Sequence, residues 1–181
     1  MVTLKINGEI RQFPKGTTFE TIAKEYQKDY DAPILVVIEN GKIKELSKKV
    51  NKDCEVKFIT LKDTIGHMTY VRTALMIMLK AIEDVVGKEK ITKLKVDFAI
   101  GHGYYCAAEG DFKIDGELVD EINERMNEIV EDKIPITKRP FHVDEAMELF
   151  REQGMTDKEK LFKYRRSSYI NVYCMDGSRH F

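Results

Sequence analysis

The segment GHMTYVRTALMIMLKAIEDVVG, residues 66–87, predicts one long helix from Thr64 to Val86. Apolar residues recur along it at spacings of three and four, which is the stripe of a helix packed against a core. The stripe comprises Val71, Ala74, Leu75, Met78, Ala81, Ile82 and Val85. Met76, Ile77 and Leu79 widen it, so we expect burial over much of the helix, under a sheet. Because His67 stands near its start, the helix is either part of a reactive site or only a scaffold.

The residues before this helix predict a small β-sheet crossed by a short helix. Residues 2–6 alternate apolar and polar side chains, and Asn7-Gly8 is a strong signal for a tight hairpin into residues 9–13. Thr17 and Glu20 have capping-box spacing, so a short helix should start there. Further strands follow on both sides of Asn40-Gly41 and over residues 54–60. This order predicts a β-grasp fold, for which a ubiquitin-like adaptor is the plainer interpretation.

The order of these elements, the Asn-Gly before KIKEL and the exit VKFITLKDTIG resemble a TGS domain over residues 1–61. TGS domains occur at the front of threonyl-tRNA synthetases, some GTPases and stringent-response enzymes. The resemblance implies an RNA- or ligand-binding regulatory module and supplies no catalytic residue.

The residues after the long helix predict an α+β arrangement. Strands are expected in KLKVDFAI and YYCAAEGDF, in IPITKRP ending at Pro140, and in SYINVYC before the turn at Asp176-Gly177. DGELVDEINERMNEIVED is an amphipathic helix with an acidic, solvated face. Two more helices are expected, one stopped by Gly154 and one begun by the capping-box pair Thr156 and Glu159. The whole chain is therefore assigned to the α+β class.

Residues 62–181 resemble the second N-terminal domain of threonyl-tRNA synthetase, which is related to the editing domain of alanyl-tRNA synthetase. The resemblance rests on GHMTYVRTALMIMLKAI, HGYYC, ELVDEINERMNEIVEDKIPI and YINVYC. In the editing enzymes, an HxxxH pair on the long helix and a CxxxH pair after a late strand meet in one cleft. There they position water against a misacylated ester.

This chain departs from both pairs. The HxxxH positions fall on Arg72 and Met76, and the CxxxH positions fall near Tyr173 and Gly177. A guanidinium stays protonated and a thioether transfers no proton, so neither replaces a catalytic histidine. A zinc site needs three or four converging ligands, and an arginine would repel the cation. We therefore expect a scaffold with no catalytic residue and no metal.

Seven residues are candidates for ligand binding. Arg72 replaces the first histidine and can hold a phosphate or carboxylate, unless it pairs with an acidic residue and closes the cleft. His102, in a Gly-flanked turn, Tyr104 and Tyr105 can contact a sugar or base, although packing explains the tyrosines equally well. A basic cluster in KEKLFKYRRSS can extend the positive surface, unless it is a solvated helix end. Its candidate residues are Lys163, Arg165 and Arg166.

Four segments resemble the N-terminal region of TGS-containing uridine kinase-like proteins, which belong to the phosphoribulokinase/uridine kinase family. These segments are HGYYC, IVEDKIPITKRP, DKEKLFKYRRSS and NVYC. The resemblance implies a non-catalytic regulatory region that partners its own downstream kinase domain. ATP and Mg²⁺ are expected only there, because this chain contains no G-x-x-x-x-G-K-[ST] motif. The alternative function is a tRNA-editing hydrolase with an altered site, and a third is a structural adaptor that dimerises the kinase.

Composition fits these alternatives. The 181 residues are 43% hydrophobic and 34% charged, with a formal net charge of −1, which does not suggest a grip on a long phosphate backbone. No apolar run approaches the ~20 residues of a membrane span, and the N-terminus has no apolar signal core. Three well-separated cysteines favour a reducing cytoplasm. A nucleotide or RNA partner and a homo-oligomer remain open, and no membrane partner is expected.

Overall fold

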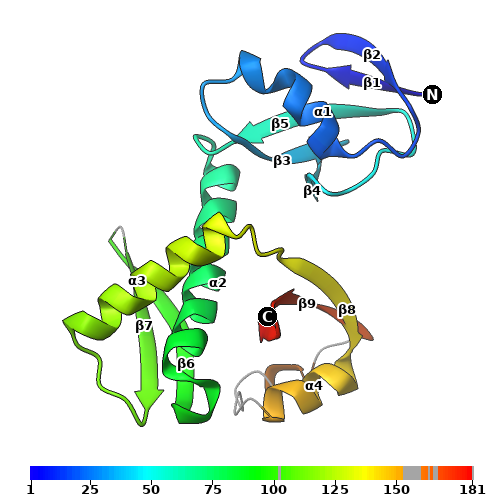
Figure 1. Cartoon of the computed structure of the whole chain (residues 1–181). Helices are drawn as coiled ribbons and strands as arrows, with labels where there is room; N and C mark the ends of the chain where they lie inside the picture. The colour runs from blue at the N-terminus through cyan, green and yellow to red at the C-terminus, as the bar shows by residue number, and fades with distance from the viewer. Residues whose placement is uncertain (102, 153–159, 163, 165–166, 181) are drawn as a thin grey trace. The chain divides into compact units, whose positions relative to one another are not determined.

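A computed structural model of the chain describes residues 1–101, 103–152, 160–162, 164 and 167–180 (Figure 1). The chain forms two compact units, Met1–Ala74 and Leu75–Phe181, which are described separately below. The division falls inside one long helix, so the expected domain limits, residues 1–61 and 62–181, stay a prediction.

The first unit is a five-stranded sheet with one helix packed on it. The strands are β1 (Val2–Ile6), β2 (Glu9–Phe13), β3 (Ile34–Glu39), β4 (Lys42–Glu45) and β5 (Cys54–Thr60). They lie in the order β2-β1-β5-β3-β4, in which only the β1–β5 pair is parallel. The two Asn-Gly turns form as predicted, with Asn7 and Asn40 at positive φ values of 52° and 46°. The β-grasp expectation is confirmed.

Helix α1 (Phe19–Tyr26) covers the sheet and is followed by a short 3₁₀ turn, η1 (Gln27–Asp29). Its buried side chains join those of the strands in one core, which includes Phe19, Ile22, Ala23, Tyr26, Leu4, Ile6, Val37 and Val56. The predicted capping residue was wrong by one position. Thr18 caps the helix by accepting from the Thr21 amide, whereas the Thr17 hydroxyl donates to the Pro14 carbonyl.

Helix α2 spans Thr64–Val86, as the sequence predicted. It is buried at Gly66 and again over Lys80–Ile82 and at Val86, but most of the residues between Gly66 and Lys80 are partly or fully exposed. The expectation of burial over much of its surface therefore holds only near its two ends. Most of the intervening apolar side chains are only partly covered, and Met76 and Ile77 among them pack against a cluster that includes Ile129 and Met175.

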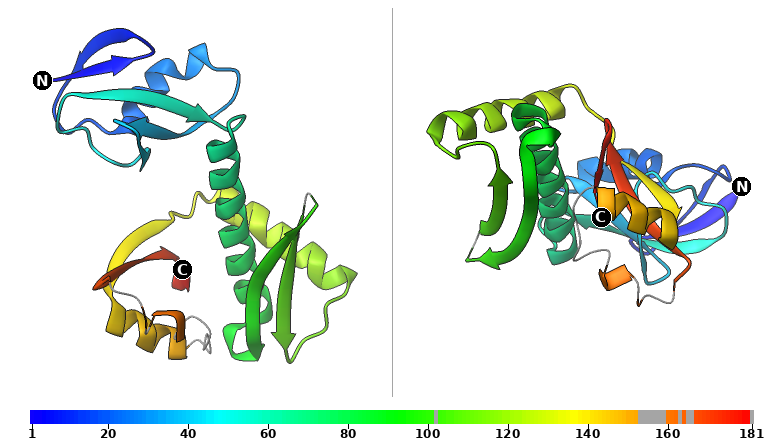
Figure 2. Two further views of the ribbon diagram at one scale, coloured as in Figure 1. Left: turned by 180° about the vertical axis from the view of Figure 1, so that it is seen from behind. Right: turned by 90° about the horizontal axis from the view of Figure 1, so that it is seen from below.

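The second unit contains two separate sheets (Figure 2). A short 3₁₀ turn, η2 (Lys88–Lys90), leads into the antiparallel hairpin of β6 (Ile91–Ile100) and β7 (Gly103–Gly110). Helix α3 (Gly116–Glu131) follows, capped by the Asp115 carboxylate. A three-stranded antiparallel sheet then has the order β10-β9-β8, made of β8 (Thr137–His142), β9 (Tyr169–Met175) and β10 (Ser178–His180).

Pro140 does not end its strand, as the sequence had suggested, but lies within β8. Because β8 is an edge strand, the missing amide of a proline costs no ladder hydrogen bond there. Helix α4 (Val143–Glu152) follows directly. The predicted stop at Gly154 and the predicted cap at Thr156 and Glu159 lie outside the described residues.

Two clusters of buried side chains hold the second unit together. One joins α4 to the sheet and consists of Val143, Ala146, Leu149, Phe150, Phe162, Ile170 and Val172. The other joins α2, α3 and β9 through Ala81, Ile129 and Met175. Among the described residues, no helix is long and apolar enough to cross a membrane.

Candidate functional site

The helix position that carries the second histidine in the resembling editing enzymes is occupied here by an apolar contact. Met76 is partly buried and packs, together with Ile77, against the cluster of Ala81, Ile129 and Met175. Arg72, one turn earlier on α2, is exposed. His67 is also exposed, in the first turn of the helix, where its amide donates to the Asp63 carbonyl. The described part of the chain holds no group of three or more His, Cys, Asp or Glu side chains arranged for a metal ion.

Charged side chains near this cluster neutralise one another. Lys80 has only 7% of its side chain exposed, and its Nζ lies 2.5 Å from Oδ1 of Asp84. The Arg125 guanidinium donates to the Glu128 carboxylate and to Oδ2 of Asp84, and these hydrogen bonds raise the pKa of Arg125. These cations are already satisfied by carboxylates, so they are poorly placed to hold an anionic ligand.

One face of the β8–β9 pair carries aromatic and polar side chains instead of a cluster of paired charges. Side chains alternate across these strands, so the cross-strand pairs Lys138–Tyr173, Pro140–Asn171 and His142–Tyr169 share a face. The opposite face contributes Ile170 and Val172 to the cluster under α4. We call the first set, residues 138, 140, 142, 169, 171 and 173, the tyrosine face.

Aromatic contacts organise the tyrosine face. The Lys138 ammonium lies over the Tyr173 ring, 5.7 Å from its centroid. His142 meets Tyr169 edge-on, with centroids 5.5 Å apart and an interplanar angle of 87°. Tyr169 is 63% exposed and Asn171 is exposed between the two tyrosines. Aromatic rings beside a cation and an amide are suited to stacking on nucleobases and to hydrogen bonding at their edges.

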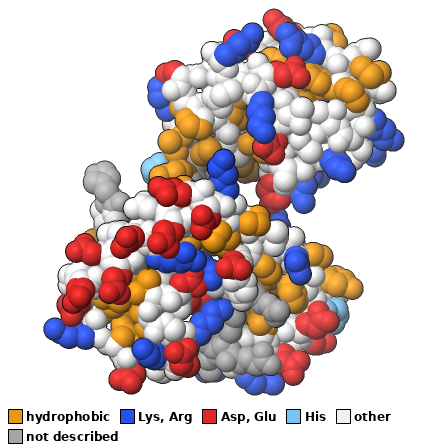
Figure 3. All heavy atoms as spheres, in the orientation of Figure 1, with side chains coloured by type: hydrophobic (Ala, Val, Ile, Leu, Met, Phe, Trp, Pro, Cys, Tyr) orange, Lys and Arg blue, Asp and Glu red, His pale blue; other side chains and the backbone are white. Residues whose placement is uncertain are grey.

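Charge also favours this face for an anionic polymer. None of its six residues is acidic, but two carboxylates contact His142: Asp144, 3.2 Å from Nδ1, and Glu145, which accepts from the His142 amide at 3.3 Å. Helix α3, in contrast, presents a row of acidic side chains to solvent (Figure 3). These are Glu117, Asp120, Glu121, Glu124, Glu128 and Glu131. The tyrosine face therefore carries fewer carboxylates than the solvent face of α3 and is the less repulsive of the two for a polyanion.

Of the residues that the sequence predicted for ligand binding, the structure describes Arg72, Tyr104 and Tyr105. Tyr104 and Tyr105 are adjacent on β7 and therefore point to opposite faces of the hairpin, 47% and 49% exposed. Tyr105 stacks on Phe98, with centroids 5.2 Å apart. Cys106 is partly buried, and burial raises the pKa of its thiol.

Four of the predicted ligand-binding residues, His102, Lys163, Arg165 and Arg166, lie outside the described residues. Arg72 belongs to the first unit and the two tyrosines of β7 to the second, so a shared cleft stays a prediction.

Sequence reasoning missed the tyrosine face. The signal was present in SYINVYC, where Tyr169, Asn171 and Tyr173 alternate with Ile170 and Val172. That alternation predicts a strand and places the two tyrosines on one side of it. It does not show that Lys138 and His142 would lie across from them, because the partner strand and its register depend on the fold.

The known proteins compared below with this chain are all threonine–tRNA ligases. No family model matches the chain. It is 30% identical over 173 residues to a threonine–tRNA ligase of Clostridium kluyveri, an alignment that covers 95% of this chain and 26% of that protein. It is 31% identical over 174 residues to the threonine–tRNA ligase of Thermotoga maritima, covering 92% of this chain and 25% of the ligase. That of Carboxydothermus hydrogenoformans is 29% identical over 183 residues, with 95% and 28% covered.

These relatives support one of the two family resemblances that the sequence suggested, the one to threonyl-tRNA synthetase. The fold is an α+β arrangement in which a β-grasp unit precedes an editing-like α+β unit, as the sequence predicted. The chain is similar to threonine–tRNA ligases over nearly its whole length. It spans about a quarter of the length of those ligases. The expected link to a uridine kinase, with its ATP-binding partner domain, receives no support from them.

Proposed function

We propose that this chain is a tRNA-binding region, related to a part of threonyl-tRNA synthetase, that holds RNA without hydrolysing an aminoacyl ester. The observation that carries this proposal is the similarity to threonine–tRNA ligases over 95% of the chain. The position where a catalytic histidine would stand is filled by Met76, which packs against an apolar cluster. Binding without chemistry is what such a site supports best.

In this proposal the tyrosine face receives unpaired bases. Tyr169 and Tyr173 are four residues apart on one strand, a separation of ~13 Å at about 3.3 Å per residue. Each ring can stack with one base, and the Asn171 amide between them can bond a base edge. Lys138, held over the Tyr173 ring, supplies a positive charge to a neighbouring phosphate.

An editing hydrolase is the second candidate, because the relatives are threonine–tRNA ligases. It would need a general base, and the two α2 positions that carry histidines in the editing enzymes hold Arg72 and Met76 instead. A regulatory role beside a kinase would instead be supported by a reading frame that continues into a G-x-x-x-x-G-K-[ST] motif.

The test measures binding of the full chain to threonine tRNA and to a short single-stranded RNA, by fluorescence anisotropy at low salt. We expect Tyr169→Ala and Tyr173→Ala each to weaken binding about tenfold, since stacking contributes roughly 1–3 kcal/mol per base. Tyr169→Phe and Tyr173→Phe keep the ring and should bind as the natural chain does.

Lys138→Ala should weaken binding and reduce its salt dependence. Lys113→Ala, which removes an exposed lysine elsewhere in the second unit, serves as its matched control. The proposal fails if neither RNA binds, or if the alanine variants of both tyrosines bind like their phenylalanine counterparts.

A further inference from the structure

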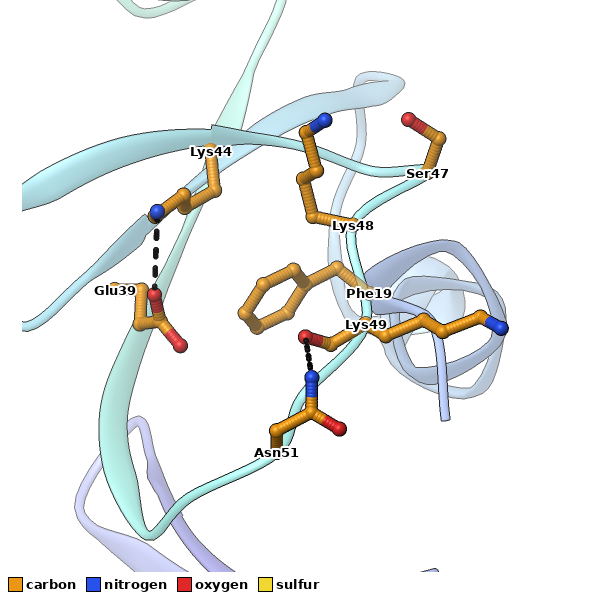
Figure 4. Close-up of a pocket in the computed structure, with 7 residues that line it drawn as sticks. All are labelled: Phe19, Glu39, Lys44, Ser47, Lys48, Lys49 and Asn51. Atoms are coloured by element: carbon orange, nitrogen blue, oxygen red, sulfur yellow. Dashed lines mark hydrogen bonds and ion pairs between the residues drawn. The ribbon is translucent and has the colours of Figure 1, made fainter. Parts of the chain in front are cut away.

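The first unit carries a pocket of about 410 Å³ between α1, the β3–β4 hairpin and the loop that follows β4 (Figure 4). Three lysines line it, Lys44 from β4 and Lys48 and Lys49 from the loop. The Phe19 ring lies between them, and Asn51 and Glu39 complete the wall. A concave site with several amines, an amide and an aromatic ring differs from an ordinary solvated lysine surface.

The backbone that presents these lysines is fixed at several points. The loop carbonyls of Leu46 and Lys48 accept from the amides of Glu20 and Phe19, at 2.8 and 3.0 Å. Val50 is fully buried and exchanges hydrogen bonds with the segment before α1, donating to Thr17 and accepting from Gly16. The loop is therefore preformed, and little backbone entropy is lost when a ligand binds.

The same hydrogen bonds determine what can hold an anion. The first amides of α1 are occupied by loop carbonyls, so they are not available to a ligand. An anion in this pocket must be held by the lysine side chains and Asn51.

The lysines are free to turn toward a ligand. Lys44 lies 3.8 Å from Glu39 and Lys48 lies 3.6 Å from Glu45, distances too long for strong charge-assisted hydrogen bonds. Their side chains are 39% and 56% exposed. Exposed pairs of this kind contribute about 0–1 kcal/mol, so exchanging a carboxylate for a ligand oxygen costs little.

We propose that this pocket binds a phosphate group, either of a free nucleotide or of an RNA backbone. Lysine ammonium groups act as point charges that suit the dispersed charge of a phosphate. The pocket has no arginine fork for planar, bidentate binding of a carboxylate. Phe19 is only 1% exposed and forms the closed floor of the pocket, so contacts to the phosphate come from the polar side chains around it. This site lies in the first unit and does not depend on the tyrosine face of the second.

The experiment uses the full chain, labelled with ¹⁵N, and titrates it at low salt with pyrophosphate, with AMP and with a short single-stranded RNA. Amide shifts of Phe19, Lys48 and Lys49 report on the pocket. We expect at least one of the three probes to move them in a saturable way. Shifts with pyrophosphate or AMP identify a free phosphate ester as sufficient, whereas shifts with RNA alone identify a backbone phosphate.

A pair of charge-matched variants separates a built site from general electrostatic attraction. The pocket variant carries Lys44→Gln, Lys48→Gln and Lys49→Gln, and should weaken binding of the effective probe at least tenfold. The control carries Lys5→Gln, Lys24→Gln and Lys57→Gln, which remove the same charge from exposed positions elsewhere in the unit. It should retain binding within about twofold, because screened charges at a distance contribute little.

The proposal is overturned if no probe moves the pocket amides, or if both triple variants lose affinity equally. A chain with Tyr169→Ala and Tyr173→Ala distinguishes this site from the tyrosine face. It should still bind pyrophosphate or AMP in the pocket if these are the effective probes. If RNA alone is effective, the pocket amides should still shift at higher RNA concentration in that chain.

Discussion

The guanidinium of Arg125 donates two hydrogen bonds to Oδ2 of Asp84, from Nε at 3.0 Å and from Nη2 at 2.9 Å, and so ties α3 to α2. Oδ1 of the same carboxylate accepts from Lys80, whose side chain is 7% exposed. One aspartate therefore balances two cations next to the apolar cluster that holds the second unit together.

Replacing that aspartate should destabilise the second unit strongly. Asp84→Ala leaves the buried Lys80 ammonium without its closest carboxylate, and we expect a loss of about 3 kcal/mol in the free energy of unfolding. Chemical denaturation followed by circular dichroism measures it. Lys80→Met should cost much less, because it removes the buried charge itself. Glu121→Ala, on the exposed face of α3, is the neutral control.

A second prediction concerns the start of α2. A Cβ built on Gly66 would stand 1.8 Å from the Thr60 carbonyl oxygen, a backbone atom that cannot move aside. Gly66→Ala should therefore destabilise the first unit by roughly 3 kcal/mol, at the upper end of overpacking effects. Gly116→Ala is the matched control, since nothing lies within 4 Å of its added Cβ. Equal thermal stability of the two variants would contradict the close approach.

A third prediction concerns thiol reactivity. Burial, with help from the Glu39 carboxylate, raises the pKa of Cys54 from 9.0 to about 11. In a chain with Cys106→Ser and Cys174→Ser, the folded protein at pH 8 should react with a thiol-specific disulfide reagent roughly a hundredfold more slowly than the urea-unfolded chain. Glu39→Gln should restore only part of the rate, because burial is the larger cause. A folded rate equal to the unfolded one would refute this.

The first unit shows how far sequence reasoning reaches. Local rules located its hairpins, because Asn7 and Asn40 adopt the positive φ that Asn-Gly turns require. The spacing of apolar residues likewise predicted both ends of helix α2 correctly. The tyrosine face and the lysine pocket escaped prediction because each depends on long-range partners. Lys138 meets Tyr173, and Phe19 meets Lys48, only after distant segments pair. Periodicity identifies which side chains share a strand face, but not what lies opposite them.

A fourth prediction is a pH dependence at the joint between β5 and α2. The amide and hydroxyl of Thr60 both donate to Oδ2 of Asp63, at 2.7 and 2.9 Å, which lowers the pKa of that carboxyl. A carboxyl with a depressed folded pKa stabilises the protein above its unfolded pKa of about 3.9, and loses this contribution as pH falls through the folded value.

Asp63→Asn should therefore destabilise the chain more at pH 6 than at pH 3. The measurement compares the difference in unfolding free energy between the natural chain and the variant at the two pH values. Other acidic groups, such as Asp31 beside Lys62, titrate in both chains and cancel in the difference. A difference that is the same at both pH values would show that the Thr60 hydrogen bonds do not favour the ionised carboxylate.

The last prediction is that the chain does not release amino acid from threonyl- or seryl-tRNA above background. Ester hydrolysis needs a group that accepts a proton from water. Met76 has no such group and is packed against Ala81, Ile129 and Met175, while Arg72 stays protonated. Labelled aminoacyl-tRNA incubated with the chain measures the rate. Time-dependent release that is abolished by His67→Ala or His142→Ala would establish hydrolysis from a different base.

A companion variant tests the physical reason directly. Met76→His places an imidazole against the apolar cluster, so it should lower the free energy of unfolding by about 1–3 kcal/mol. Met76→Leu keeps an apolar side chain of similar volume and should cost less than about 1.5 kcal/mol. If the histidine variant is as stable as the leucine variant, the position is open to water rather than packed. The absence of hydrolysis would then follow from the side chain's chemistry alone.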